Sequence, residues 1–224
     1  MVLLLLHEST ITMQQEHYDL ATLLELPRRY RGTLLNYVSG FKSANLIGTK
    51  SEDGQANLAI FNSVVHIGAN PPYLGFILRP TTVERHTYNN IQSTRFYTIN
   101  AIGESFYSKA HQTSAKYAAN QSEFDAVGLT AVYKNDFYAP YIAESPVQMG
   151  MQLEEVHPIA CNGTYLVVGK LLHLYLPKDS VADDGHFDLS EQNVVTIGGL
   201  DTYYRTQKLE QLPYAKAPKS TLDQ

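Results

Sequence analysis

Residues 45–63 read NLIGTKSEDGQANLAIFNS, and this stretch decides the fold class. Two runs suited to strands, 45–50 and 56–61, flank a short polar segment that contains Asp53-Gly54. An Asp-Gly pair between two such runs is a strong hairpin signal, because tight hairpin turns need residues that accept positive φ angles. The stretch therefore predicts two antiparallel strands joined by a tight turn.

Short strands and turns continue on the C-terminal side of this hairpin, and helical spacing dominates on its N-terminal side. We expect helices over 18–41 with a break at Pro27, over 82–91 and over 105–117, and strands over 63–67, 73–79, 95–99, 146–156, 164–176 and 194–197. The run 164–176 is the longest apolar one, so it predicts a central strand bent at Gly169. Strands joined by hairpins with a few helices favour a mainly β fold, an antiparallel barrel with added helices.

Composition excludes several classes of protein. The chain has 224 residues and a net charge of -5, which argues against a dedicated nucleic-acid binder. Cys161 is the single cysteine, so neither a disulfide framework nor a cysteine-based zinc site can form within one chain. Residues 2–6 are apolar but lack the basic flank of a signal peptide, and no run reaches the roughly 20 apolar residues of a membrane span. We expect a cytoplasmic protein with no metal, nucleic-acid or membrane partner.

Hydroxyl and guanidinium groups gather in residues 79–87, which read RPTTVERHT. Thr81 and Glu84 fit a capping box, which predicts that a helix begins near Thr82. Free backbone N–H groups at a helix start, threonine hydroxyls and arginines are the donors that hold a phosphate. The same pattern also fits an ordinary capped surface helix with two solvated arginines, and these residues alone leave both interpretations open.

Taken in order, these segments resemble the flavin reductase-like, FMN-binding split-barrel family, and flavoredoxin-like proteins in particular. The resemblance covers roughly residues 40–205. It rests on the order of residues 48–50, 53–54, 57–63, 70–72, 85–91 and 97–100, and later pieces at 123–125, 163–173, 183–185 and 199–205 are also similar. It implies a six-stranded antiparallel split β-barrel, usually a homodimer with FMN near the subunit interface. The chain then divides into an N-terminal helical extension (1–40), the barrel domain (41–212) and a polar C-terminal tail (213–224).

The resemblance also implies which residues bind the flavin. The end of one strand would line the ring, largely through backbone groups: Asn57, Ala59, Ile60, Phe61, Asn62 and Ser63. The phosphate would be held by Thr81, Thr82, Arg85, His86 and Thr87, with Arg79 nearby. Two positions depart from the commoner pattern, since Asn62 stands where Ser is frequent and His86 where Asp is common. The change to His86 adds a donor.

The implied activity is that of an FMN-dependent oxidoreductase, an NAD(P)H:flavin reductase that moves a hydride from nicotinamide to flavin. FMN is preferred over FAD because of the family, and the chain has no dinucleotide fingerprint that would separate NADH from NADPH. No proton-transfer residue is expected, because hydride transfer needs positioning rather than acid–base catalysis. An FMN-binding electron carrier that does not oxidise NAD(P)H is the alternative, and a barrel that has lost its flavin is a third. Five residues could cover the open face of the ring: His111, Ser114, Tyr117, Tyr203 and Tyr204. The same residues could instead pack inside the protein or form subunit contacts.

Overall fold

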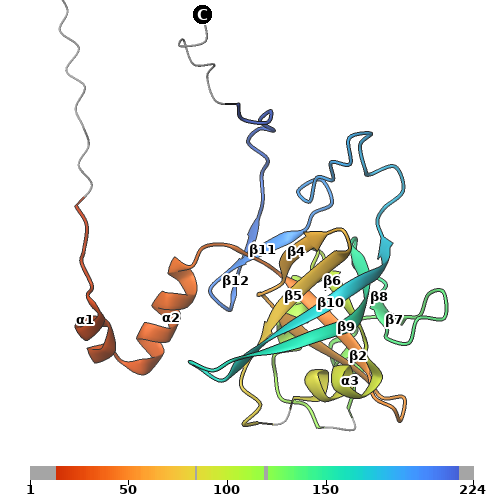
Figure 1. The fold of residues 1–224 in the computed structure, drawn as a ribbon, viewed down its shortest axis with the longest axis horizontal. Helices are drawn as coiled ribbons and strands as arrows, with labels where there is room; N and C mark the ends of the chain where they lie inside the picture. The colour runs from red at the N-terminus through yellow and green to blue at the C-terminus, as the bar shows by residue number, and fades with distance from the viewer. Residues whose placement is uncertain (1–13, 84, 119–120, 217–224) are drawn as a thin grey trace, which may run out of the picture.

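Antiparallel strands form the body of the protein in the computed structural model, which describes residues 14–83, 85–118 and 121–216. Figure 1 shows the strands wrapped into one body, from which the N-terminal helices and the C-terminal segment project. Within the described residues the main sheet has seven strands, in the order β3 (Ala56–Phe61), β2 (Asn45–Lys50), β6 (Phe96–Ala101), β9 (Gln148–Ile159), β10 (Thr164–Tyr175), β5 (Pro72–Leu78) and β4 (Val65–Ala69). The predicted mainly β, antiparallel split-barrel class is confirmed, although the main sheet has seven strands where six were expected.

Smaller elements close the ends of this body. A second sheet joins β1 (Lys42–Ser43), β11 (Val195–Gly198) and β12 (Thr202–Arg205), and a third pairs β7 (Ala131–Val132) with β8 (Tyr141–Ile142). Three short helices follow the barrel strands: α3 (His86–Thr94), α4 (Tyr107–Gln112) and α5 (Glu123–Val127). The helix expected over 105–117 is therefore shorter than predicted.

The two strands that the sequence marked most clearly are both present. β2 pairs with β3 across the predicted Asp-Gly turn, and β10 lies between β9 and β5, as a central strand should. The ladder of β10 with β9 shifts register between Val168 and Gly169, which places the predicted bend at the glycine. A side chain at Gly169 would overlap the Tyr97 hydroxyl and lie 2.8 Å from Tyr97 Cζ, so the glycine makes room for this ring.

The core lies on both faces of β2. Leu46 and Ile47 are both fully buried, yet they belong to different clusters, because successive side chains of a strand point to opposite faces. Leu46 packs with residues of α4, α5 and β11, including Phe106 and Phe124. Ile47 packs with Phe76, Tyr97 and Met151 inside the barrel.

The N-terminal segment forms α1 (Leu20–Glu25) and α2 (Arg28–Val38), which confirms the predicted helical region and its break at Pro27. We call these two helices the arm. No residue of the arm is buried, and Figure 1 shows both helices lying beside the strands rather than on them. Arg31 Nη1 donates to the carbonyl of Leu24 at 2.7 Å, which joins α2 to the end of α1. Tyr37 OH donates to Asp201 Oδ1 at 3.0 Å, which holds the arm to the turn between β11 and β12.

The helix after Pro80 begins later than the sequence predicted. It starts at His86, and Arg85 before it is extended, with φ -129° and ψ 93°. Thr81 and Thr82 lie in an exposed turn, and Glu84, on which the capping box depends, lies outside the described residues. The start is set by a tertiary contact instead, because the buried hydrogen bond from Asn57 to Thr87 fixes where the first helical turn can form.

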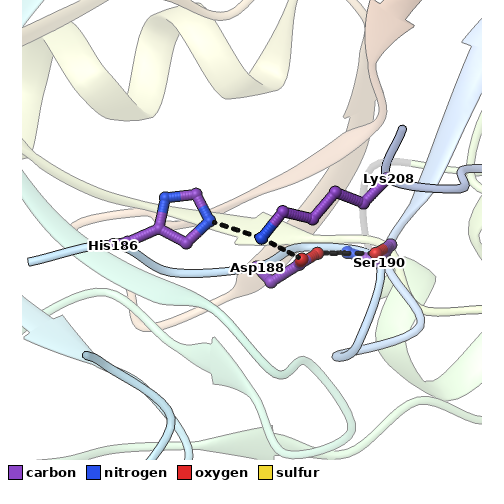
Figure 2. Close-up of polar contacts among 4 residues, drawn as sticks. All are labelled: His186, Asp188, Ser190 and Lys208. Atoms are coloured by element: carbon purple, nitrogen blue, oxygen red, sulfur yellow. Dashed lines mark hydrogen bonds and ion pairs between the residues drawn. The ribbon is translucent and has the colours of Figure 1, made fainter. Parts of the chain in front are cut away.

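A charged contact fixes the start of the C-terminal segment. Lys208 Nζ lies 3.4 Å from Asp188 Oδ2 and 3.4 Å from His186 Nε2 (Figure 2). Asp188 Oδ1 also accepts the Ser190 hydroxyl at 2.5 Å and the Ser190 N–H at 2.9 Å. The Ser190 hydroxyl above all, with help from Lys208, lowers the pKa of Asp188 to about 2.

No helix in the described ranges is long and apolar enough to cross a bilayer.

Candidate functional site

The outer edge of β3 lies beside α5 and has no strand partner among the described residues, where β3 pairs only with β2. The Leu58 N–H points to this edge and donates to Glu123 Oε2 at 2.9 Å. Because backbone groups of alternate residues point the same way, the N–H and C=O of Ile60 face the same edge. Ala59 and Ile60 are half-buried beside this edge. We use the name recess for this edge together with the start of α3.

The side chains that follow on this strand are used by the protein itself. The rings of Phe61 and Phe76 meet edge to face with centroids 5.0 Å apart. Asn62 Nδ2 donates to the carbonyl of Gly199 at 3.0 Å. Ser63 Oγ donates to the carbonyl of Ile77 and accepts its N–H, both at 3.1 Å. These bonds fix the strand end, and a ligand at the edge would meet mainly backbone groups.

A buried polar cluster joins β3 and β2 to α3. Asn57 Nδ2 donates to Thr87 Oγ1 at 3.0 Å and to Thr49 Oγ1 at 3.3 Å, and Asn90 Nδ2 donates to Thr49 Oγ1 at 3.0 Å. All four residues are less than a tenth exposed. Thr87 accepts a hydrogen bond here, and its own hydroxyl hydrogen has no acceptor in the described ranges. The cluster therefore couples β3 to the start of α3.

Two buried polar atoms beside β3 have no partner in the part of the chain that the structure describes. They are Arg85 Nε, two residues before Thr87, and Ser122 Oγ, next to the Glu123 that binds Leu58. A buried donor without an acceptor costs roughly 1–3 kcal/mol, and such groups call for an explanation. A guanidinium beside threonine hydroxyls fits a phosphate, so the donor set is compatible with the tail of a flavin mononucleotide.

The predicted phosphate residues are divided by the structure. Arg85, His86 and Thr87 lie at the start of α3, where they are half-buried or buried. Arg79, Thr81 and Thr82 are exposed on the segment between β5 and α3, and no hydrogen bond in the described ranges ties these three to β3. The structure thus brings Asn57 and Thr87 together and leaves the earlier donors at the surface.

A histidine of α4 and two tyrosines lie close together. His111 Nδ1 lies 3.1 Å from Tyr203 OH, and the Tyr107 ring centroid is 5.3 Å from that of Tyr203. Burial, with the Asp201 carboxylate adding to it, raises the pKa of Tyr203 to about 12, so its hydroxyl is a neutral donor at physiological pH. The other candidates for the ring face are engaged elsewhere: Tyr117 donates to the carbonyl of Gln112 at 3.2 Å, and Tyr204 packs on Phe41. Ser114 is exposed.

Sequence reasoning did not identify the roles of Ser122 and Glu123. Glu123 lies 65 positions after Leu58 in the chain, so only tertiary structure shows that its carboxylate reaches the β3 edge. No local signal marks such a contact, because the two residues share neither an element nor a motif. The described residues also contain no group of three or more His, Cys, Asp or Glu side chains that could hold a metal ion.

The fold and the recess define a class: an antiparallel split-barrel protein with an open strand edge beside buried phosphate-type donors. Comparison with known proteins agrees. The family model "Flavin reductase like domain" matches residues 39–191, and the chain belongs to this family.

Three proteins illustrate the similarity. A candidate flavin reductase with a split-barrel domain from Shewanella frigidimarina NCIMB 400 is 46% identical, with a TM-score of 0.87, over 90% of this chain and 100% of that one. Flavoredoxin of Desulfovibrio vulgaris (Miyazaki F) has a TM-score of 0.68 and 20% identity over 78% of this chain and 92% of that one, which supports the fold alone. An uncharacterized protein of Deinococcus radiodurans is 24% identical over 91% of this chain and 93% of its own length. The predicted family is thereby confirmed.

Proposed function

We propose that this chain is an FMN-dependent oxidoreductase, an NAD(P)H:flavin reductase that transfers a hydride from nicotinamide to flavin. The observation that carries the proposal is the buried Nε of Arg85, which has no partner among the described residues and lies two positions before the buried Thr87. Membership of the flavin reductase-like family supports the same ligand class.

Each part of the recess has a proposed task. Arg85 and Thr87 hold the phosphate, His86 assists them, and exposed donors at Arg79, Thr81 and Thr82 complete the shell. The backbone of residues 59–63 holds the ring, with Asn57 fixing β3 against α3. Fixed N–H dipoles at that edge stabilise negative charge on a bound group without needing to reorganise. FMN is proposed rather than FAD because the family resemblance implies it.

When bound, the flavin supplies the hydride chemistry, and the protein supplies position. No general acid or base is assigned, because a hydride needs only an open face and contact distance. His111 and Tyr203 hold each other at 3.1 Å, and we propose that this pair borders the open face and excludes water from it.

Anaerobic mixing of the purified protein with FMN and either NADH or NADPH tests the activity directly. Loss of the visible absorbance of oxidised flavin, at a rate that depends on protein concentration, is the expected result. No loss with either nicotinamide would reject the reductase.

An electron carrier is the second candidate, favoured by the fold shared with flavoredoxin. Such a carrier would hold FMN tightly, receive electrons from a partner and leave NAD(P)H unoxidised. A purified protein that is yellow but inactive with both nicotinamides would support this candidate over the reductase.

We also propose a cytoplasmic homodimer with the arm as a contact element. Apolar side chains of the arm are largely exposed in the single chain: Leu20 is 71% and Leu24 61% exposed, and Val38 is 68% exposed. Helices of 6 and 11 residues are too short to be stable alone in water, so they need a surface to pack on. We propose in addition that the chain divides at residues 40 and 212, so that the arm and the tail are additions to the barrel.

A further inference from the structure

A cleft lies between the arm and the turn that joins β11 to β12, next to the contact that Tyr37 makes with this turn. Its volume is about 550 Å³, within the range of about 300–1,000 Å³ that is typical of ligand pockets. On the arm side it is lined by Arg28, Arg29 and Tyr37, and on the other side by Gly199, Leu200 and Asp201. We call it the arm cleft. It lies outside the recess described above.

Two arginines line the arm cleft, although the chain as a whole has a net charge of -5. The guanidinium groups of Arg28 and Arg29 form no hydrogen bond or ion pair with any residue in the described ranges. Arg31, on the same helix, does have a structural task, since it donates to the carbonyl of Leu24 at 2.7 Å. The Asp201 carboxylate accepts hydrogen bonds from Tyr37 and Thr202. The cleft is therefore lined by two cations without partners among the described residues and by one anion that already has donors.

The wall of the arm cleft touches the flavin recess. Gly199 lines the cleft, and its carbonyl accepts the amide of Asn62 at 3.0 Å. Gly199 has a φ of +62°, and any side chain on it would overlap the Tyr37 ring, so glycine is required where arm and turn meet. The wall of the cleft at Gly199 is therefore in direct contact with the strand end that we assign to the flavin ring.

We propose that the arm cleft binds the phosphate groups of the nicotinamide dinucleotide, which places its nicotinamide end toward the flavin recess. This proposal rests on the reductase function proposed above. Guanidinium groups bind phosphate oxygens through paired, charge-assisted hydrogen bonds, and Arg28 and Arg29 have such bonds to offer. The Asp201 carboxylate suits a ribose hydroxyl beside those phosphates, a pairing common in dinucleotide sites.

Calorimetric titration of NAD⁺ and NADP⁺ into the purified full chain tests the proposal without catalysis. The variant is Arg28→Gln with Arg29→Gln, which removes the two charges and keeps similar side-chain length. The matched control is Lys178→Gln with Lys216→Gln, which removes two charges from exposed positions that do not line the cleft. We expect the arginine variant to bind at least about tenfold more weakly, and the lysine variant to bind like the unmodified protein. Unchanged circular dichroism and FMN affinity would show that both variants are folded.

The two dinucleotides identify which phosphate is bound. Equal weakening for NAD⁺ and NADP⁺ supports contact with the shared diphosphate, and weakening for NADP⁺ alone supports contact with its 2′-phosphate. Unchanged affinity in the arginine variant overturns the proposal, and so does a full chain that binds neither dinucleotide. The flavin function is judged separately: if FMN fails to bind while the arginines still control dinucleotide binding, the cleft stands and the reductase does not.

Discussion

The barrel and the arm are built on different principles. In the barrel, Leu46 and Ile47 are fully buried on opposite faces of one strand, and β2 is held between two neighbours. In the arm no residue is buried, and its place depends on a few contacts around Tyr37. The barrel is therefore defined by burial and strand pairing, while the arm has free apolar and cationic groups to offer to a partner or a ligand.

This difference predicts where mutations will act. Substitutions in the barrel should change the free energy of unfolding, and substitutions in the arm should change association or binding.

The largest stability effect is expected for Leu58→Ala. Leu58 is fully buried in β3, and truncating such a leucine costs about 2–5 kcal/mol of unfolding free energy, since a cavity remains. Denaturant titration measures the loss, and Leu209→Ala is the control because Leu209 is 97% exposed. Equal effects of the two substitutions would contradict the assignment of the core.

Gly169→Ala should destabilise the barrel by about 1–3 kcal/mol, because its methyl group would collide with the Tyr97 ring. Tyr97→Phe alone should be close to neutral, since the Tyr97 hydroxyl is buried without a partner in the described ranges. The double variant should recover part of the loss, because the hydroxyl is the nearest obstacle. Strictly additive unfolding free energies would show that the two positions do not meet.

In the arm, Leu20→Ser combined with Leu24→Ser should weaken self-association by roughly tenfold or more, because interface anchors of this kind contribute 1–2 kcal/mol or more each. Sedimentation at several protein concentrations measures the dimer dissociation constant. The far-ultraviolet spectrum of the barrel should stay the same. A dimer of unchanged strength would show that the arm is not its contact element.

The smallest effect is expected for Asp188→Asn, and it should depend on pH. The pKa of Asp188 is about 2 in the folded chain against an ordinary value of 3.8. Its ionised form therefore stabilises the fold above about pH 4, and this contribution is lost as the pH falls through 2. Thermal unfolding at pH 6 and pH 2 should show a deficit in the variant that is much smaller at pH 2 than at pH 6. A deficit of the same size at both values would rule out the titration of this carboxylate as the cause.

Local patterns in the sequence were enough to predict the strands of the main sheet, but not the short strands β1, β7, β8 and β12. The Asp53-Gly54 turn and the apolar run around Gly169 were read correctly, because turn chemistry and hydrophobic runs act over a few residues. The start of α3 was predicted wrongly near Thr82, because the buried contact of Thr87 with Asn57 joins positions 30 residues apart.

In the candidate site, too, contacts between distant segments could not be predicted from local sequence. Its strand and its phosphate segment could be proposed from residue order and family resemblance. The contact of Glu123 with Leu58 and the unpartnered Nε of Arg85 required the folded chain, since both depend on distant segments. The division into extension, barrel and tail and the roles of the site residues stay predictions.

Equilibrium titration of FMN, followed by quenching of its fluorescence, tests the central claim most directly. We predict saturable binding to the full chain, weakened about tenfold to a hundredfold in Arg85→Ala, because a charged donor contributes roughly 1.5–3 kcal/mol. Arg205→Ala is the matched control, since Arg205 pairs with Glu104 at the surface and should bind FMN normally. Identical dissociation constants for the full chain and Arg85→Ala would show that the flavin phosphate does not bind at the start of α3.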